Sequence, residues 1–135
     1  MILIAFDYGS KKIGVASGND LIGTASPQRP LLCRDGQPDW QQMSALLEEW
    51  RPELLVVGLP LNMDGTEGAS SQRARKFARR LQGRYGISVV MVDERLSTRE
   101  ARSRTGQRGP DPKVDSMAAV VIAEGYLGGA DCVPP

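Results

Sequence analysis

The chain contains no histidine, and this absence removes several kinds of catalytic site at once. It excludes Ser-His and Cys-His nucleophile pairs, His-ligated zinc and a histidine general base. Cysteine is also scarce, because Cys33 and Cys132 stand alone, without the spacing of a disulfide framework or a zinc site. Any chemistry must come from carboxylates, Lys, Arg, Tyr, Ser, Thr or Cys. Carboxylates acting with a hard divalent cation, magnesium or manganese, are the leading option by elimination.

Long hydrophobic runs are also missing. No apolar stretch approaches the roughly 18 residues that span a bilayer, and the start MILIAFDYG lacks the basic flank of a secretion signal. A hydrophobic fraction of 41% and a charged fraction of 24% are typical of a globular protein. We therefore expect a single domain over 1–135, with a frayed tail at 129–135, a cytoplasmic location and no membrane partner.

The charge is unevenly distributed along the chain, although the net charge is only +1. Twelve of the 17 Lys and Arg residues, but only four of the 16 Asp and Glu residues, lie between Arg73 and Lys113. A basic segment of this kind favours an anionic partner, most commonly nucleic acid. A solvated helix face is the alternative explanation.

The hydrophobic pattern predicts an α/β fold. Apolar runs without alternation indicate buried strands, and apolar residues at helical spacing indicate helices. The first three strands should be antiparallel, with the third interrupted by Pro27 and Pro30, and the later ones should belong to βαβ crossovers. The expected strands are 2–6, 11–17, 21–33, 54–59 and 88–92; the expected helices are 40–50, 71–84, 97–104 and 115–127.

Carboxylates follow several of these strands. Asp7 ends the first strand, Asp93 and Glu94 follow the last, and Asp115 heads the final helix. Ligands of open α/β sheets bind at the carboxyl ends of the strands. If Asp7, Glu94 and Asp115 point into one cleft, their repulsion calls for cations, and two divalent ions about 3.5–4 Å apart would fit them. Such a site performs phosphoryl transfer.

Each of these residues also has a purely structural interpretation. Asp7 could be a turn residue, Asp115 could cap its helix, and Asp93, on the other side of its strand from Glu94, could pair with a nearby arginine. The 61–68 turn could contact phosphate or form only a tight turn and a cap. The proposed nucleic-acid contacts, which could also be plain solvated surface, are Lys12, Asn62, Thr66, Arg73, Arg95, Arg99 and Arg102.

Four segments in order resemble one family. FDYGSKKIGVA, VVGLPLNMDGTEG, VDERLSTREA and VDSMAAVVIAEGYL are similar to the YqgF-type proteins, named as Holliday junction resolvases or pre-16S rRNA nucleases. The resemblance implies a ribonuclease H-like fold with a mixed five-stranded sheet. It also implies catalytic and metal-binding roles for Asp7, Glu94 and Asp115, with Asp93 as a fourth candidate ligand.

We therefore expect a nuclease that depends on Mg or Mn and hydrolyses phosphodiester bonds. RNA is the favoured substrate, in 5′-end processing of pre-16S rRNA. Cleavage of four-way DNA junctions is the runner-up and would require a homodimer. Two alternatives come from other classes: an RNA-binding assembly factor without catalysis, in which Asp7→Asn would change little, and an actin-like nucleotide-binding domain, which ATP would protect in a thermal melt.

Overall fold

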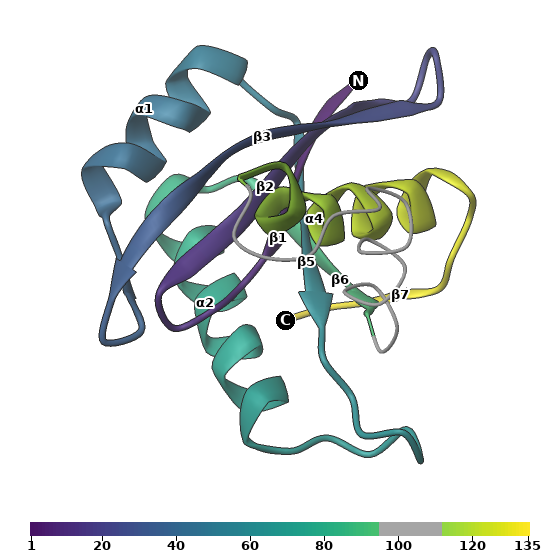
Figure 1. The fold of residues 1–135 in the computed structure, drawn as a ribbon. Helices are drawn as coiled ribbons and strands as arrows, with labels where there is room; N and C mark the ends of the chain where they lie inside the picture. Colours follow the sequence, from purple (N-terminus) through teal and green to yellow (C-terminus); the bar gives the residue numbers. More distant parts are fainter. Residues whose placement is uncertain (95–111) are drawn as a thin grey trace.

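All five predicted strands lie in one mixed sheet in the computed structural model, which describes residues 1–94 and 112–135 (Figure 1). For residues 112–115 the description covers the backbone alone. β1 is antiparallel to β2 and parallel to β5, which is itself parallel to β6. In sheet order the strands are β4 (Gln37–Pro38), β3 (Thr24–Arg34), β2 (Lys12–Asn19), β1 (Ile2–Asp7), β5 (Leu54–Leu59), β6 (Ser88–Asp93) and β7 (Cys132–Val133).

Helices cover both faces of this sheet. α1 (Trp40–Trp50) and α2 (Ala69–Tyr85) pack on one face, and α4 (Pro112–Leu127) packs on the other (Figure 1). The α1 helix begins at Asp39, whose side chain accepts hydrogen bonds from the first-turn backbone, and α2 ends at Gly86 in a left-handed conformation (φ 64°). The expected boundaries of α1 and of β5 agree with the structure.

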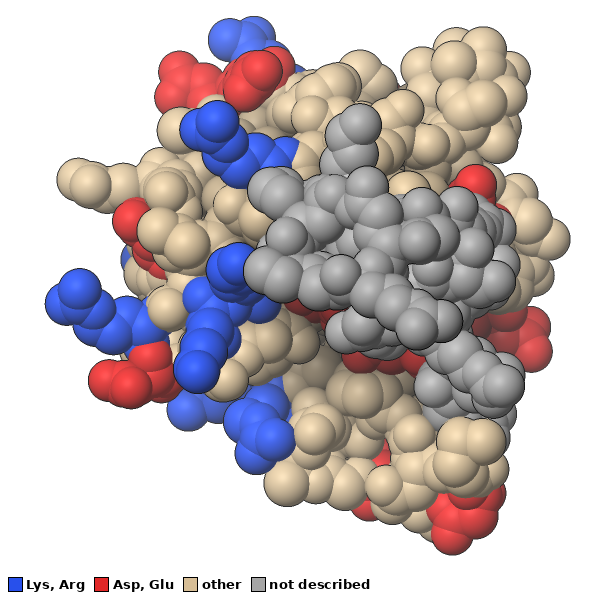
Figure 2. Space-filling model, in the orientation of Figure 1, with Lys and Arg blue, Asp and Glu red and all other residues tan. Residues whose placement is uncertain are grey.

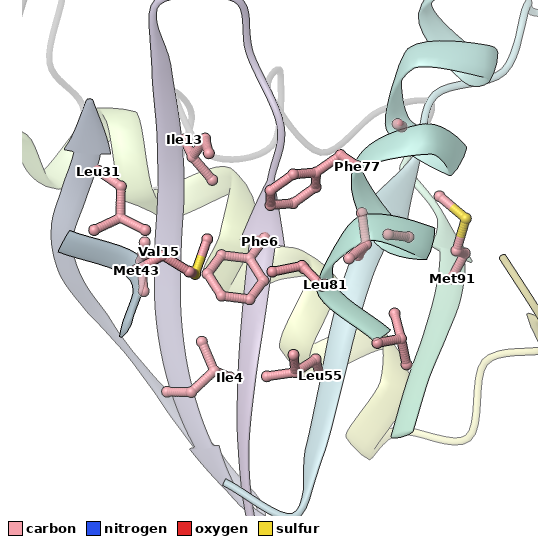
Figure 3. Packing of buried hydrophobic residues seen from close by; sticks show 14 of the residues in the cluster. Ile4, Phe6, Ile13, Val15, Leu31, Met43, Leu55, Phe77, Leu81 and Met91 are labelled. Carbon is pink, nitrogen blue, oxygen red and sulfur yellow. The ribbon is translucent and has the colours of Figure 1, made fainter. Parts of the chain in front are cut away.

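Alternation along β1 divides the hydrophobic core into two layers. Ile4 and Phe6 face α1 and α2, where Phe6 meets Phe77 edge to face at 5.8 Å (Figure 3). Leu3 and Ala5 face α4. Both sides of the central strands are buried, which explains why their sequences are continuously apolar.

The register brings the carboxyl ends of three strands to the same edge of the sheet. Phe6 of β1 lies opposite Val57 of β5, and Leu59 of β5 lies opposite Asp93 of β6. The residues that end these strands are therefore neighbours, although about fifty residues separate β1 from β5 in the sequence and about thirty separate β5 from β6. This edge carries the candidate site.

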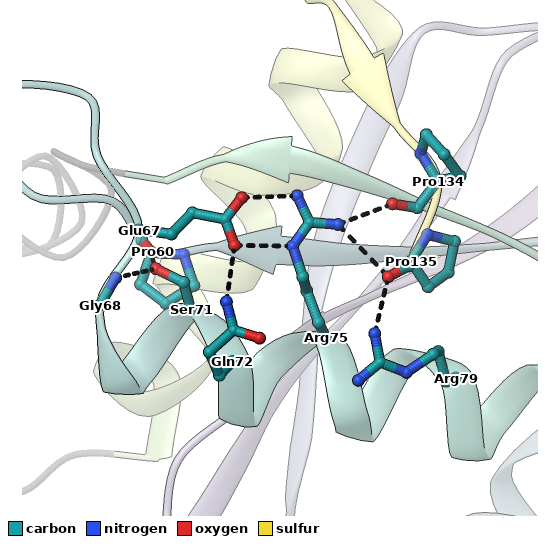
Figure 4. A network of polar contacts seen from close by, with 9 residues as sticks. All are labelled: Pro60, Glu67, Gly68, Ser71, Gln72, Arg75, Arg79, Pro134 and Pro135. Carbon is teal, nitrogen blue, oxygen red and sulfur yellow. Dashed lines mark hydrogen bonds and ion pairs between the residues drawn. The ribbon is translucent and has the colours of Figure 1, made fainter.

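Three expectations need correction. The sheet has seven strands instead of five, because the two-residue strands β4 and β7 extend its edges. The tail does not fray: β7 pairs with β6, and the Arg75 guanidinium, held by Glu67, donates to the Pro134 carbonyl at 2.9 Å (Figure 4). The last helix begins at Pro112, three residues before the expected start, since proline suits a first helical position. The expected helix 97–104 lies outside the described residues.

Candidate active site

Asp7 and Glu94 come together across the central strand of the parallel part of the sheet. Asp7 is the last residue of β1, Glu94 directly follows β6, and β5 lies between these strands. Alternation places Asp7 on the same face as Ala5, and Glu94 on the same face as Val92, and both of these faces pack against α4. The two carboxyl groups share a side-chain hydrogen bond. The sequence-based prediction that these two acids converge is supported by this contact.

The environment of the pair favours a shared proton. Burial raises the pKa of Asp7, and the hydrogen bond from Glu94 opposes that shift. Burial also raises the pKa of Glu94, and the charge of Asp7, the shared hydrogen bond and the charge of Asp93 raise it further, to about 10. The shared hydrogen bond lowers the pKa of Asp7 and raises that of Glu94, so Glu94 holds a proton more strongly than Asp7 and is the donor of the pair. A cation could take the place of this proton.

Gly58 makes room for Glu94, and sequence reasoning missed this role. A Cβ at position 58 would lie 2.7 Å from Glu94 Cδ and 2.6 Å from Ile122 Cδ1, and closer still to Glu94 Oε2. Real Cβ atoms essentially never approach other atoms so closely. The Glu94 carboxyl therefore packs directly against the Gly58 backbone, between β5 and α4. The GLP tripeptide at the strand end was the visible signal, because a glycine inside a strand often marks a close approach.

The structure describes the backbone of Asp115, in the first turn of α4, but not its side chain. Residue 115 lies within the first turns of α4, so it does not cap the helix. The next residue, Ser116, is fully buried; its Oγ accepts a hydrogen bond from the Val15 backbone at 3.3 Å and donates to the Gln28 carbonyl. These contacts fix the start of α4 over β2 and β3. The role of Asp115 stays a prediction.

Asp93 lies on the opposite side of β6 from Glu94. It follows Met91 in the alternation, and Met91 packs in the core layer of α1 and α2. Its side chain is exposed. The structure therefore separates Asp93 from the carboxyl pair, as the alternation predicted. Among the described side chains, no group of three acids forms a ready-made metal site.

The turn after β5 uses its polar groups internally. Asn62 Nδ2 donates to Thr66 Oγ1 at 2.9 Å, while the Thr66 backbone N–H and hydroxyl both donate to Asp64 Oδ1. The backbone N–H of Gly65 donates to the Asn62 carbonyl at 2.8 Å. These bonds favour the tight-turn interpretation, and phosphate contacts from Asn62 and Thr66 stay a prediction.

The predicted basic contacts fall in different regions. Lys12 is exposed at the start of β2, and Arg73 is exposed on α2, on the face of the sheet opposite the carboxyl pair. Three other predicted contacts, Arg95, Arg99 and Arg102, lie outside the described residues.

The carboxyl pair suits a divalent cation. Its donors are hard oxygens, which magnesium and manganese prefer. They are buried side by side at a sheet edge, and Gly58 keeps the space beside Glu94 clear of a side chain. Two buried acids without a cation must keep a proton between them, whereas a cation would allow both to ionise. Asp7 and Glu94 are therefore the residues that could hold a metal.

Comparison with known proteins places the chain in a family. Residues 1–129 match the RuvX family, described as Holliday junction resolvase. A protein of Alcanivorax borkumensis named "Putative pre-16S rRNA nuclease" is 62% identical over 128 residues, which cover 95% of this chain and 96% of that protein. A protein of the same name from Chromohalobacter salexigens is 55% identical over 131 residues, covering 93% and 88% respectively.

Solved structures confirm the fold. The chain is similar to Thermus thermophilus RuvC in complex with a Holliday junction substrate, with a TM-score of 0.55 and 15% identity over 98% of this chain and 99% of that one. It is also similar to the yeast mitochondrial Holliday junction resolvase Ydc2, with a TM-score of 0.53 and 11% identity over 93% and 77%. The ribonuclease H-like architecture expected from the sequence is confirmed. No helix in the described part of the chain is long and apolar enough to cross a membrane.

Proposed function

This chain belongs to the RuvX family, and we propose that it is a divalent-metal-dependent nuclease whose metal is held by Asp7 and Glu94. The observation that carries the proposal is the contact between these two half-buried carboxyl groups at the carboxyl edge of the sheet, with Glu94 resting against Gly58. Asp115 is proposed as the third ligand, on the strength of the family resemblance.

The side chains divide the work. A divalent cation bound here would activate a water as the nucleophile and offset the negative charge on the leaving oxygen. Asp7 accepts the hydrogen bond that Glu94 donates, and so it orients the Glu94 carboxyl group. Gly58 fixes how deep the Glu94 carboxyl sits, and Ser116 anchors the start of α4 and hence the position of residue 115. Accurate placement of this kind matters, because small displacements of catalytic groups are costly.

RNA is the substrate that we favour, in 5′-end processing of pre-16S rRNA, with action in the cytoplasm. The support is the name shared by curated relatives at 62% and 55% identity. The second candidate is cleavage of four-way DNA junctions, which the description of the family and the RuvC-like fold favour. That activity would require a dimer with two sites related by symmetry.

The test uses the protein and its Asp7→Asn variant on three labelled substrates: a single-stranded RNA, a 5′-extended ribosomal RNA precursor and a four-way DNA junction. Each is incubated with manganese, magnesium or EDTA. The Asp131→Asn variant is the control, because it removes the same charge from an exposed position before β7. Metal-dependent cutting that is lost with Asp7→Asn and kept with Asp131→Asn is the expected result.

The substrate that is cut decides between the two candidates. Cutting of RNA alone favours rRNA processing, and symmetric cutting of the junction favours resolution. If no substrate is cut while RNA is still bound, the catalytic proposal is wrong and the chain is an RNA-binding factor.

A further inference from the structure

A second polar concavity lies on the face of the sheet opposite the carboxyl pair. It has a cavity volume of about 160 Å³, between the turn that joins β3 to β4 and the first half of α2. Its lining includes Tyr8, Gly36, Gln37, Arg73, Lys76 and Arg80. Three of these six residues are cationic. We call this concavity the Tyr8 pocket.

Tyr8 connects the pocket to the active site. It directly follows Asp7, so consecutive residues at the end of β1 serve the two faces of the sheet. The Tyr8 ring stacks on Phe77 of α2 with centroids 4.9 Å apart, and its hydroxyl donates a hydrogen bond to the Gly36 carbonyl. These contacts hold the pocket wall in a fixed place beside the catalytic edge. Substrate that crosses this edge from Asp7 would reach the Tyr8 pocket first.

A row of cations leads away from the pocket along α2. Arg73, Lys76, Arg80 and Arg84 recur every three or four residues and therefore share one face of the helix. At 1.5 Å per residue the row is about 16 Å long. We call it the α2 basic stripe. Figure 2 shows Lys and Arg side chains gathered on the side of the molecule where α2 and the β3–β4 turn lie.

Among the residues that the structure describes, the contacts of the stripe are with neutral partners. Arg73 donates to the Ser70 hydroxyl at 3.2 Å, and Arg80 donates to the Gln37 side-chain carbonyl at 2.8 Å. Arg84 lies 4.0 Å from the centre of the Trp40 ring. All of these partners are neutral, and within the described residues no salt bridge joins a carboxylate to the stripe. By contrast, Arg75, on another side of the same helix, is paired with Glu67 at 2.8 Å.

The pocket is also more positive than negative in charge. Burial and the neighbouring Cys33 raise the pKa of Tyr8, and the charges of Arg73 and Arg80 oppose this rise. Asp35, in the β3–β4 turn, is the one acidic residue among the described residues of the lining. The cations outnumber it, so the pocket favours an anion the size of a phosphate group.

We propose that the Tyr8 pocket seats a backbone phosphate of the nucleic-acid substrate and that the α2 basic stripe carries the adjoining backbone away from the active site. This inference rests on the proposed nuclease function. Recognition should be independent of sequence, because cations spaced along a line contact phosphates and not base edges. An acidic protein segment is the competing partner, and the regular spacing of the stripe and its position beside Asp7 favour nucleic acid.

The test measures binding without cleavage. Labelled single-stranded RNA is titrated with protein in EDTA, by fluorescence anisotropy, between 50 and 200 mM salt. The test variant is the double Arg73→Gln, Lys76→Gln. The control is the double Arg29→Gln, Arg51→Gln, which removes two exposed charges from β3 and from the far end of α1. Thermal melts verify that both variants are folded.

We expect the test variant to bind RNA at least tenfold more weakly, while the control stays within twofold of the wild type. The slope of log affinity against log salt should fall by about 1.4 for two lost single-strand phosphate contacts. Equal losses in both variants, or no loss in either, would overturn the inference. The inference would also be overturned if polyglutamate of equal charge competed with RNA and if its binding were weakened by the same stripe substitutions. The surface would then recognise acidic protein.

Cleavage of the same RNA with manganese separates this inference from the proposed function. If the wild type cuts RNA and the test variant binds as tightly as the wild type, the inference is wrong and the nuclease stands. If the wild type cuts nothing but its binding depends on the stripe, the catalytic proposal is wrong and the inference stands.

Discussion

Replacement of Gly58 by alanine tests how closely the active site depends on the packing of Glu94 against the Gly58 backbone. The added Cβ would lie 2.7 Å from Glu94 Cδ and 2.6 Å from Ile122 Cδ1, whereas ordinary van der Waals contact begins at 3.4 Å. Glu94 Oε2 would be closer still, so the Glu94 carboxyl must move by about 1 Å and Ile122 by about 0.8 Å. Both contacts involve the ends of flexible side chains, so the cost in the free energy of unfolding should be about 1–2 kcal/mol.

Activity should suffer more than stability. A misplacement of about 1 Å in a catalytic group can cost roughly 10²-fold in rate, so a shift of this size should lower kcat by roughly 30- to 100-fold. The assays are manganese-dependent cleavage of labelled RNA under single-turnover conditions and urea-induced unfolding. The double variant Gly58→Ala, Ile122→Val removes the clash with α4 and should regain stability without regaining activity, because Glu94 stays displaced.

Gly83 supplies a matched control. It lies within α2, and a Cβ there would meet nothing within 4 Å. Gly83→Ala should therefore stabilise the protein by about 0.5–1 kcal/mol through helix propensity and leave cleavage unchanged. If Gly58→Ala kept full cleavage, or if Gly83→Ala lost as much activity as Gly58→Ala, the reasoning about Glu94 placement would be refuted.

Two further changes probe the carboxyl pair and its support. The pKa of Glu94 is raised to about 10 in the folded protein. Without metal, the unfolding free energy of the wild type should therefore decline as pH rises from the ordinary glutamate pKa towards 10, and Glu94→Gln should remove this decline. Equal pH profiles of the wild type and Glu94→Gln in urea unfolding would contradict this prediction. Ser116→Ala deletes the hydroxyl that bonds the Val15 N–H and the Gln28 carbonyl. It should lower the unfolding free energy by about 1–3 kcal/mol, and a change below a few tenths would show that the hydroxyl is dispensable.

The sequence predicted the layers of the fold well because its signals are local. The apolar runs of β1 and β5 and the helical spacing of α1 depend on residues close together in the chain. The short strand β7 was missed because two residues carry no periodic signal, and the pairing with β6 joins segments about forty residues apart. The tail was expected to fray for the same reason, since its contacts with Arg75 come from distant sequence.

The site shows the same division. Asp7 and Glu94 were predicted together because both follow buried strands, and strand ends of a parallel sheet share an edge. Gly58 was missed because its role depends on Ile122, which returns from α4 to the same spot more than sixty residues later. The Tyr8 pocket was hidden because it needs the β3–β4 turn beside α2, a contact that no periodicity reveals. Tyr8 itself could be read from sequence only as a residue that stacks or packs.

The most direct test of the metal site is calorimetric titration of manganese into metal-free protein near neutral pH. The wild type should bind manganese. Loss of a residue that only supports a metal ligand costs roughly 10- to 100-fold in metal affinity, so Asp7→Asn, which changes a proposed ligand, should weaken manganese binding by more than this. Asp93→Asn, on the other side of β6, should bind manganese like the wild type. Manganese binding that is unchanged by Asp7→Asn would contradict the claim that Asp7 and Glu94 form the metal centre.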